Sequence, residues 1–234
     1  MSQLGRRGGG SAAERAALLR LVSLLLQYPD DELLAARPQL AAAAQALSRP
    51  HARHPLVAFT TWYAAAEPME LARQYVETFD LRRKCGLYLT YYPHGDTRRR
   101  GMAMLLLKQR YRAAGLTPPA GELPDYLPVV CEFAALAGPD AGEAPLRQHR
   151  KGLELIRAAL HERSSPYALM LDALCATLPA LSAAQADSVA GLALAGPPAE
   201  EVGLAPFAPP EYATGMTVVA SGMPMVADGM EVRR

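Results

Sequence analysis

The chain has 234 residues, the size of one large domain or two small ones, and we expect a single domain with tails. Half of the residues are hydrophobic but only 6% are aromatic, so Leu, Ala, Val and Met must fill the core, which favours helices over strands. Lys and Arg number 24 against 23 for Asp and Glu, and this balance gives no overall field that would attract nucleic acid or an anionic membrane.

Apolar residues at helical spacing predict an all-α protein, a single-domain bundle of about eight helices. Residues 1–11 hold three consecutive glycines and little to bury, so we expect a flexible tail, with order beginning near Ala12. The first helix should end at Tyr28-Pro29, and Asp30 can cap the second. We expect helices over 12–28, 31–49, 55–65, 69–79, 97–114, 124–137, 144–163 and 166–178.

The segment between the fourth and fifth predicted helices is ambiguous. Residues 87–92 read Leu-Tyr-Leu-Thr-Tyr-Tyr, a composition typical of a β-strand. Because a second strand to pair with it is missing from the pattern, we expect the preceding helix to continue into Tyr92. Asp96 can cap the helix over 97–114, whose apolar residues cover more than one face, so we expect that helix to be central and buried.

The C-terminal part of the chain changes character after Pro179. Residues 180–234 are rich in Pro and Gly and hold six acidic residues against two basic ones. Such a segment buries little apolar surface, so we expect an acidic, disordered tail. The predicted organisation is therefore a tail over 1–11, a helical domain over 12–179 and a tail over 180–234.

The sequence lacks the common signatures of enzymes and metal sites. It has no GxxxxGK[ST] loop, GxGxxG turn, GxSxG elbow or HExxH helix. Cys85, Cys131 and Cys175 form no CxxC pair, and we expect each to be a buried apolar residue in a reducing cytoplasm. His51 and His54 have HxxH spacing without a third donor nearby. We expect a protein that is not an enzyme and binds no metal or cofactor.

Export or membrane insertion is also not expected. Arg6-Arg7 followed by the apolar residues 18–26 resembles a twin-arginine export signal, but Glu14, Arg15 and Arg20 interrupt the stretch that should be uncharged. No apolar run approaches the roughly 20 residues that span a bilayer. We therefore expect a cytoplasmic protein without stable membrane association.

Several short motifs fall in the middle of the chain: YVETFDL at 75–81, LYLTY at 87–91, HGDTR at 94–98, Arg100-Gly101 and LPDYLP at 123–128. In order and spacing they resemble the NarJ family of nitrate reductase assembly chaperones, whose wider relatives are the TorD-type maturation chaperones. Tyr28-Pro29-Asp30 resembles the same family's early helix turn. The resemblance covers roughly residues 18–178, with the boundaries placed to within a few residues.

The resemblance implies an all-α chaperone that binds the unassembled catalytic (alpha) subunit of respiratory nitrate reductase through its N-terminal segment. It implies that the chaperone supports insertion of the molybdenum cofactor before membrane docking and is absent from the finished enzyme. The client could instead be a sister enzyme of the molybdopterin group. A homodimer formed by domain swapping, with the loop 117–121 as the hinge, is a further alternative.

The resemblance also implies the position of the client site. Asp125 and Glu132 are seven residues apart, so on one helix they could receive basic client residues, although Asp125 could equally complement the helix dipole and Glu132 could simply be solvated. We expect ordinary core positions for Leu127, Val130, Phe133, Met102 and Leu106. The residues that match the family's pattern, and that we expect to line the client-peptide groove, are Tyr75, Phe79, Asp80, His94, Gly95, Asp96, Pro124, Asp125, Tyr126 and Glu132.

A second interpretation concerns the turn that holds Arg98, Arg99 and Arg100. Three arginines and free backbone N–H groups at a helix start could bind an anion such as phosphate, or the pyrophosphate of the cofactor during insertion. The alternative function is then a small enzyme or carrier that acts on a phosphorylated ligand through His94 and these arginines. A solvated basic first turn explains the same residues without a ligand.

Overall fold

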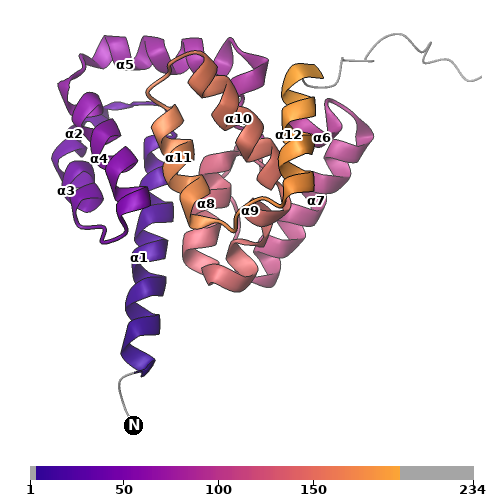
Figure 1. Ribbon diagram of the computed structural model, residues 1–234, viewed down its shortest axis with the longest axis horizontal. Helices are drawn as coiled ribbons and strands as arrows, with labels where there is room; N and C mark the ends of the chain where they lie inside the picture. Colours follow the sequence, from indigo (N-terminus) through magenta and orange to yellow (C-terminus); the bar gives the residue numbers. More distant parts are fainter. Residues whose placement is uncertain (1–3, 196–234) are drawn as a thin grey trace, which may run out of the picture. The chain divides into compact units, whose positions relative to one another are not determined.

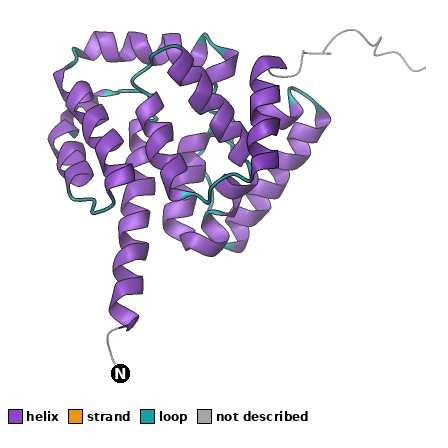
Figure 2. Ribbon diagram, viewed as in Figure 1, coloured by secondary structure: helices purple, strands orange, loops and turns teal. Residues whose placement is uncertain are grey.

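The computed structural model describes residues 4–195, with side chains from 12 to 191, and its regular elements in that range are all helical (Figures 1 and 2). The prediction of an all-α protein is confirmed. The α-helices are α1 (Leu4–Leu25), α2 (Asp31–Ala35), α3 (Arg37–Gln45), α4 (Pro50–Ala65), α5 (Pro68–Tyr75), α6 (Tyr91–His94), α7 (Arg98–Ala113), α8 (Leu127–Ala137), α9 (Ala144–Gln148), α10 (Arg150–Glu162), α11 (Ala168–Thr177) and α12 (Ala183–Ala195).

Short irregular helical segments join several of these helices. A π-helical turn over Val76–Asp80 extends α5, a 3-10 turn follows at Arg83–Cys85, and a second π-helical turn at Gly138–Gly142 follows α8. In Figure 1, α2, α3 and α4 lie at one end of the bundle and α6 and α7 at the other, with α8, α10 and α11 between them. None of the helices within residues 4–195 is long and apolar enough to cross a membrane.

The central element is α1, which packs against α3, α8 and α11. Its buried side chains follow helical spacing and include Leu18, Val22 and Leu25. The helix begins at Leu4, upstream of Ala12, where the sequence predicted order to begin. Extending a helix whose C-terminal half is already packed costs less than nucleating a new one, which explains how the helix reaches back into glycine-rich sequence.

The charges that interrupt the apolar pattern of α1 hold the helix in place. Arg15 forms an ion pair with Glu143, which is only 2% exposed, and its Nη2 donates to the carbonyl of Thr177 at 2.6 Å. The neighbouring Glu14 carboxylate accepts hydrogen bonds from the Ser48 backbone N–H (2.5 Å) and the Ser48 hydroxyl (2.7 Å). These bonds lower the pKa of Glu14. The N-terminal helix is thereby tied to three later parts of the chain.

Prolines explain where the predicted second and third helices differ from the structure. Asp30 caps α2 as predicted, accepting from the Leu33 N–H at 2.9 Å. The helix then breaks at Ala36, because Pro38 has no N–H to donate back along the helix. Pro50 begins α4 instead of closing a turn before it, and the exposed His51 lies on this helix. Among the described residues there is no group of three or more potential metal ligands.

The segment before α6 corrects the expected continuous helix. Tyr88 instead forms an isolated antiparallel bridge with Tyr126, and a bend and a turn flank it at Leu87 and Leu89. The continuous helix is therefore wrong, and the β-type composition corresponds to one bridge whose partner lies in a loop far along the chain. The predicted helix over 144–163 is also divided, into α9 and α10, at His149.

The predicted C-terminal tail contains a helix in its first part. α12 follows Ser182, whose hydroxyl accepts from the Gln185 N–H (3.3 Å) while the Gln185 side chain accepts from the Ser182 N–H (3.0 Å). This reciprocal pair is a capping box, and α12 packs against α10. The Pro and Gly content that predicted disorder lies mostly beyond this helix, in residues 196–234, which are outside the described residues.

The Arg15–Glu143 pair predicts a stability effect on α1. Replacing Arg15 by Met leaves the buried Glu143 with only Arg147, at 3.4 Å, and should lower the free energy of unfolding by about 2 kcal/mol in a chemical denaturation experiment. Arg20 is exposed on the same helix, so Arg20→Met should change that energy by no more than about 0.5 kcal/mol. Equal effects of the two variants would contradict a specific role for the pair.

Candidate functional site

Two of the family motifs meet through backbone hydrogen bonds. The Leu89 N–H donates to the carbonyl of Asp125 (3.0 Å), and the Leu127 N–H donates to the carbonyl of Leu87 (2.7 Å). The rings of Tyr88 and Tyr126 lie 5.5 Å apart at this bridge. The LYLTY and LPDYLP motifs, more than thirty positions apart in the printed sequence, therefore form one structural unit.

A fully buried carboxylate lies at the centre of this unit. Asp125 has no solvent exposure, and its Oδ2 accepts from the Thr90 hydroxyl at 2.5 Å and from the Thr90 N–H at 3.3 Å. Arg100 Nη2 lies 3.6 Å from the same oxygen, an ion pair too long for a close hydrogen bond. Asp125 Oδ1 and Arg100 Nε are both buried without a hydrogen-bond partner. The carboxylate therefore depends on Thr90 and on the charge of Arg100.

Arg100 connects this carboxylate to the HGDTR turn. Its Nη1 donates to Asp96 at 2.7 Å, one helical turn earlier. Its guanidinium lies 5.7 Å from the ring centres of both Tyr88 and Tyr91, within the range of cation–π attraction. One arginine thus contacts residues of three family motifs and fixes the start of α7 against them.

The turn before α7 differs in one detail from the expected cap. Thr97, not Asp96, is the N-cap residue of α7, and its hydroxyl donates to the carbonyl of His94 at 2.8 Å. Gly95 adopts φ 54° and ψ −155°, a conformation that is open to glycine and costly for other residues. Asp96 is exposed and pairs with Arg100 instead of capping. The motif residues therefore have structural explanations within the turn itself.

A second buried cluster surrounds Tyr75. The Tyr75 hydroxyl donates to the carbonyl of Leu26 (3.1 Å) and lies 2.9 Å from the hydroxyl of Tyr126. Burial raises the pKa of Tyr126 to about 12 and that of Tyr75 further, so both hydroxyls stay protonated. The ring of Phe79 packs 4.9 Å from that of Tyr75 and 4.8 Å from that of Tyr167. This cluster joins the end of α1 to α5 and the LPDYLP motif.

The remaining predicted site residues are dispersed. Asp80 is exposed at the end of the π-helical turn, and the carbonyl of Pro124 accepts from the Tyr111 hydroxyl at 2.6 Å. The prediction that Asp125 and Glu132 share a helix face is wrong, because α8 begins at Leu127 and leaves Asp125 in the preceding loop. Glu132 is exposed on α8, whereas Asp125 is buried. Direct contact of these residues with a client stays a prediction.

The arginine turn is only partly available to a ligand. Arg100 is 16% exposed and is engaged with Asp96 and Asp125. Arg98 and Arg99 are exposed on the first turn of α7. The turn therefore leaves Arg98 and Arg99 accessible to a ligand, and Arg100 has a structural role that the sequence did not reveal.

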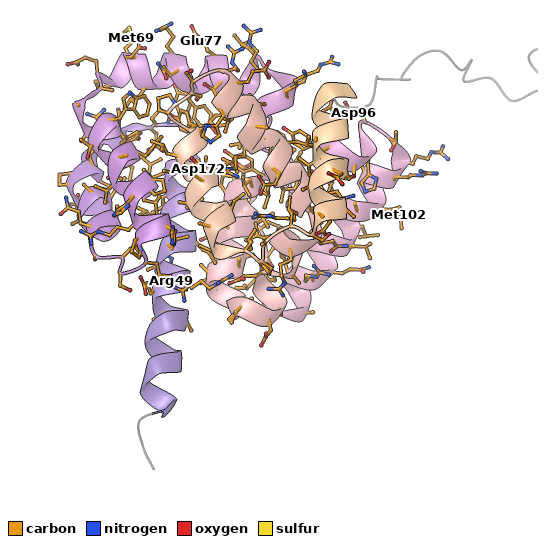
Figure 3. The ribbon with its side chains drawn as sticks, in the orientation of Figure 1. Arg49, Met69, Glu77, Asp96, Met102 and Asp172 are labelled. Atoms are coloured by element: carbon orange, nitrogen blue, oxygen red, sulfur yellow. The ribbon has the colours of Figure 1, made fainter. Side chains whose placement is uncertain are left out.

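The outward face of α7 contradicts the expectation of a buried central helix. Only Leu107 and Tyr111 of α7 are buried, in a small cluster with Val129 and Phe133 of α8. Met102 (59% exposed), Leu105 (42%) and Leu106 (61%) instead point to solvent, and Figure 3 shows Met102 at the outer edge of the bundle. The basic residues that flank this apolar stretch were the missed signal, because a core helix would not carry so many: Arg98, Arg99, Arg100, Lys108, Arg110 and Arg112.

A hollow of about 180 Å³ lies where the end of α7 meets α8. Leu116, Phe133 and Leu136 supply apolar surface. Glu132 is the acidic residue that lines the hollow. Leu136 is 50% exposed. The α7–α8 pair therefore offers a small apolar hollow and an exposed apolar row, which consists of Met102, Leu105 and Leu106.

Comparisons with known proteins identify the family of the chain. Residues 30–172 match the family model described as the nitrate reductase delta subunit. The chain is 35% identical over 159 residues to the nitrate reductase molybdenum cofactor assembly chaperone NarJ of Escherichia coli K12, covering 67% of each protein. It is 34% identical over 168 residues to a probable chaperone of the same name from Bacillus subtilis, covering 72% of this chain and 91% of that one.

Two further relatives extend the comparison. The nitrate reductase-like protein NarX of Mycobacterium tuberculosis H37Rv is 41% identical over 160 residues, but the match covers only 23% of NarX. A candidate redox enzyme maturation protein from Archaeoglobus fulgidus has a solved structure that shares the helical fold, with a TM-score of 0.53, 23% identity and coverage of 69% of this chain and 92% of that one. The fold is thus that of a helical maturation protein. The chain belongs to the nitrate reductase delta subunit family, and the resemblance to NarJ is confirmed.

The buried carboxylate gives a stability prediction with a matched control. Asp125→Asn removes the charge that faces Arg100 in a fully buried position, so it should lower the free energy of unfolding by about 3 kcal/mol. Glu132→Gln is the same chemical change on an exposed residue of α8 and should stay within about 0.5 kcal/mol. Urea denaturation of both variants measures the difference, and a neutral Asp125→Asn would disprove the role assigned to this carboxylate.

The break between α9 and α10 gives a pH prediction. Burial lowers the pKa of His149 below its ordinary value of 6.5; Asp125 opposes this shift, and His94 and Arg110 add to it. The unfolded chain therefore binds more protons at this site, so the contribution of His149 to stability should fall as the pH drops below about 6.5. His149→Gln should reduce the slope of unfolding free energy between pH 7 and pH 5. An unchanged slope would contradict the assignment.

Proposed function

We propose that the chain is an assembly chaperone of a respiratory nitrate reductase. It binds the unassembled catalytic subunit in the cytoplasm through that subunit's N-terminal segment. It supports insertion of the molybdenum cofactor before the subunit docks at the membrane, and it does not stay in the finished enzyme. Membership of the family and the named role of the NarJ relatives support the chaperone role.

The observation that carries the binding proposal is the outward face of α7. Met102 lies one helical turn before Leu105 and Leu106, and each of these three large apolar side chains exposes at least two-fifths of its surface. Contiguous exposed apolar residues mark interaction surfaces more often than isolated ones do. Methionine adds adaptability, because its unbranched side chain can fit different partners. This face suits the apolar side of a client helix or extended segment.

The buried network behind α7 supports the same proposal. Arg100, in the first turn of α7, is held by Asp96, Asp125 and the two tyrosine rings. Leu107 and Tyr111 hold the other side of the helix against α8. A face positioned in advance loses little entropy when a partner binds. The motif residues therefore act as a framework for the client surface, and Asp96, Glu132 and the half-buried His94 lie where a client could still contact them.

The contacts of the described polar residues favour a role in binding over a role in catalysis. Asp125 is engaged by Thr90 and Arg100, and the hydroxyls of Tyr75 and Tyr126 face each other. Burial raises the pKa of all three thiols, those of Cys85, Cys131 and Cys175, which keeps them protonated and poorly nucleophilic. These groups fit structural roles, so the proposed function is binding.

The proposal predicts which substitutions weaken client binding. Leu105→Glu and Leu106→Glu each place a charge on the apolar row and should weaken binding of a labelled N-terminal peptide of the catalytic subunit by about tenfold. Fluorescence anisotropy measures the affinity with the full chain. A corresponding peptide from another molybdoenzyme of the same cell tests which enzyme is the client.

The chain offers a matched control for these variants. Met69 is 84% exposed on α5, at a different part of the bundle, and Figure 3 shows it pointing outward. Met69→Glu makes a similar change in charge and should leave the affinity within about twofold. If Met69→Glu weakened binding as much as Leu106→Glu, or if neither did, the α7 face would not be the client surface.

A further inference from the structure

A second surface feature lies away from α7, between the 3-10 turn at Arg83–Cys85 and the end of α10. It is a hollow of about 590 Å³, within the range of small-molecule sites. Four cationic side chains line it, those of Arg82, Arg83, Lys84 and Arg163. Glu162 is the one carboxylate among its lining residues. The hollow is therefore strongly cationic, although the whole chain is close to neutral.

Three of the four cationic side chains of this hollow have no acidic partner among the described residues. Arg82, Lys84 and Arg163 form no ion pair with any acidic residue of the described chain, unlike Arg15, Arg73 or Arg157. The floor adds no negative charge either, because Cys85 is 1% exposed and burial raises the pKa of its thiol. Several cations that face one hollow without partners repel one another, and a bound anion would relieve this repulsion.

Both rims of the hollow are held by buried contacts. The hydroxyl of the buried Tyr92 donates to the carbonyls of Lys84 and Gly86, both at 2.9 Å, which fixes the backbone of the first rim. On the second rim, Ser164 has φ 52° and the Ser165 N–H donates to the carbonyl of Leu160 at 3.0 Å, closing the end of α10. The backbone of the 3-10 turn and that of the end of α10 are therefore preorganised for a ligand.

We propose that this hollow binds a small soluble molecule that carries a pyrophosphate or two neighbouring phosphate groups. Guanidinium groups match phosphate oxygens with paired hydrogen bonds, and lysine adds a point charge. The volume leaves room for an organic part beside the phosphates, against the apolar surface of Leu81 and Ala159. The site is separate from the α7 face and does not depend on the proposed client binding.

Calorimetry of the full chain tests this site, with inorganic pyrophosphate and ADP as probes and inorganic phosphate for comparison. We expect pyrophosphate and ADP to bind more tightly than phosphate. Arg82→Ala combined with Arg163→Ala should weaken pyrophosphate binding at least about tenfold. Glu162→Gln removes the opposing carboxylate and should strengthen binding by about twofold or more. All three positions are exposed, so circular dichroism should show unchanged helices.

The control is the other basic surface of the chain. Arg98→Ala combined with Arg99→Ala removes the same charge from the start of α7 and should leave pyrophosphate binding within about twofold. Equal weakening by the two double variants, or weakening by the α7 pair alone, would overturn the proposal. So would the absence of binding by either probe at millimolar concentration, or binding of an oligoglutamate peptide in place of pyrophosphate. Client-peptide affinity measured on the same variants should not change, which separates this site from the proposed function.

Discussion

The ion pair between the buried Asp125 and Arg100 is the interaction on which the motif region depends. A carboxylate without solvent exposure is stable only if nearby donors and an opposite charge compensate its lost hydration. Thr90 supplies two hydrogen bonds and Arg100 supplies the charge, so the LYLTY, HGDTR and LPDYLP motifs must come together around it. The same arginine lies in the first turn of α7, so its contacts set the position of the helix that exposes Met102, Leu105 and Leu106.

Polar contacts of this kind also organise the rest of the bundle. Arg15 and Glu14 tie α1 to the turn before α9, the end of α11 and the start of α4, while the leucines of the same helix fill the core. Apolar burial alone would tolerate shifts of one helix along another, because it has no direction. Buried charges and hydroxyls such as that of Tyr75 have specific partners, so they select one arrangement.

Local patterns in the sequence predicted most helices, and the errors came from interactions that local patterns do not contain. The cap at Asp30 and the apolar face of α1 could be predicted from the sequence, because caps and helix faces depend on residues close together in the chain. The bridge between Tyr88 and Tyr126 was missed because its second partner is a loop far along the chain. Leu106 was expected in the core because several faces of α7 are apolar, whereas only one face meets α8. The order and spacing of the motifs were sufficient to recognise the family, but burial of Asp125 and Tyr75 follows only from the tertiary structure.

The central claim is that the buried motif network presents the outward face of α7 to the client. Amide hydrogen exchange of the full chain, with and without the N-terminal peptide of the catalytic subunit, tests this claim most directly. Bound peptide should slow exchange in α7, over Arg98–Ala113, and leave α5, over Pro68–Tyr75, unchanged. Slower exchange confined to α5 and the following π-helical turn, with no change in α7, would contradict it.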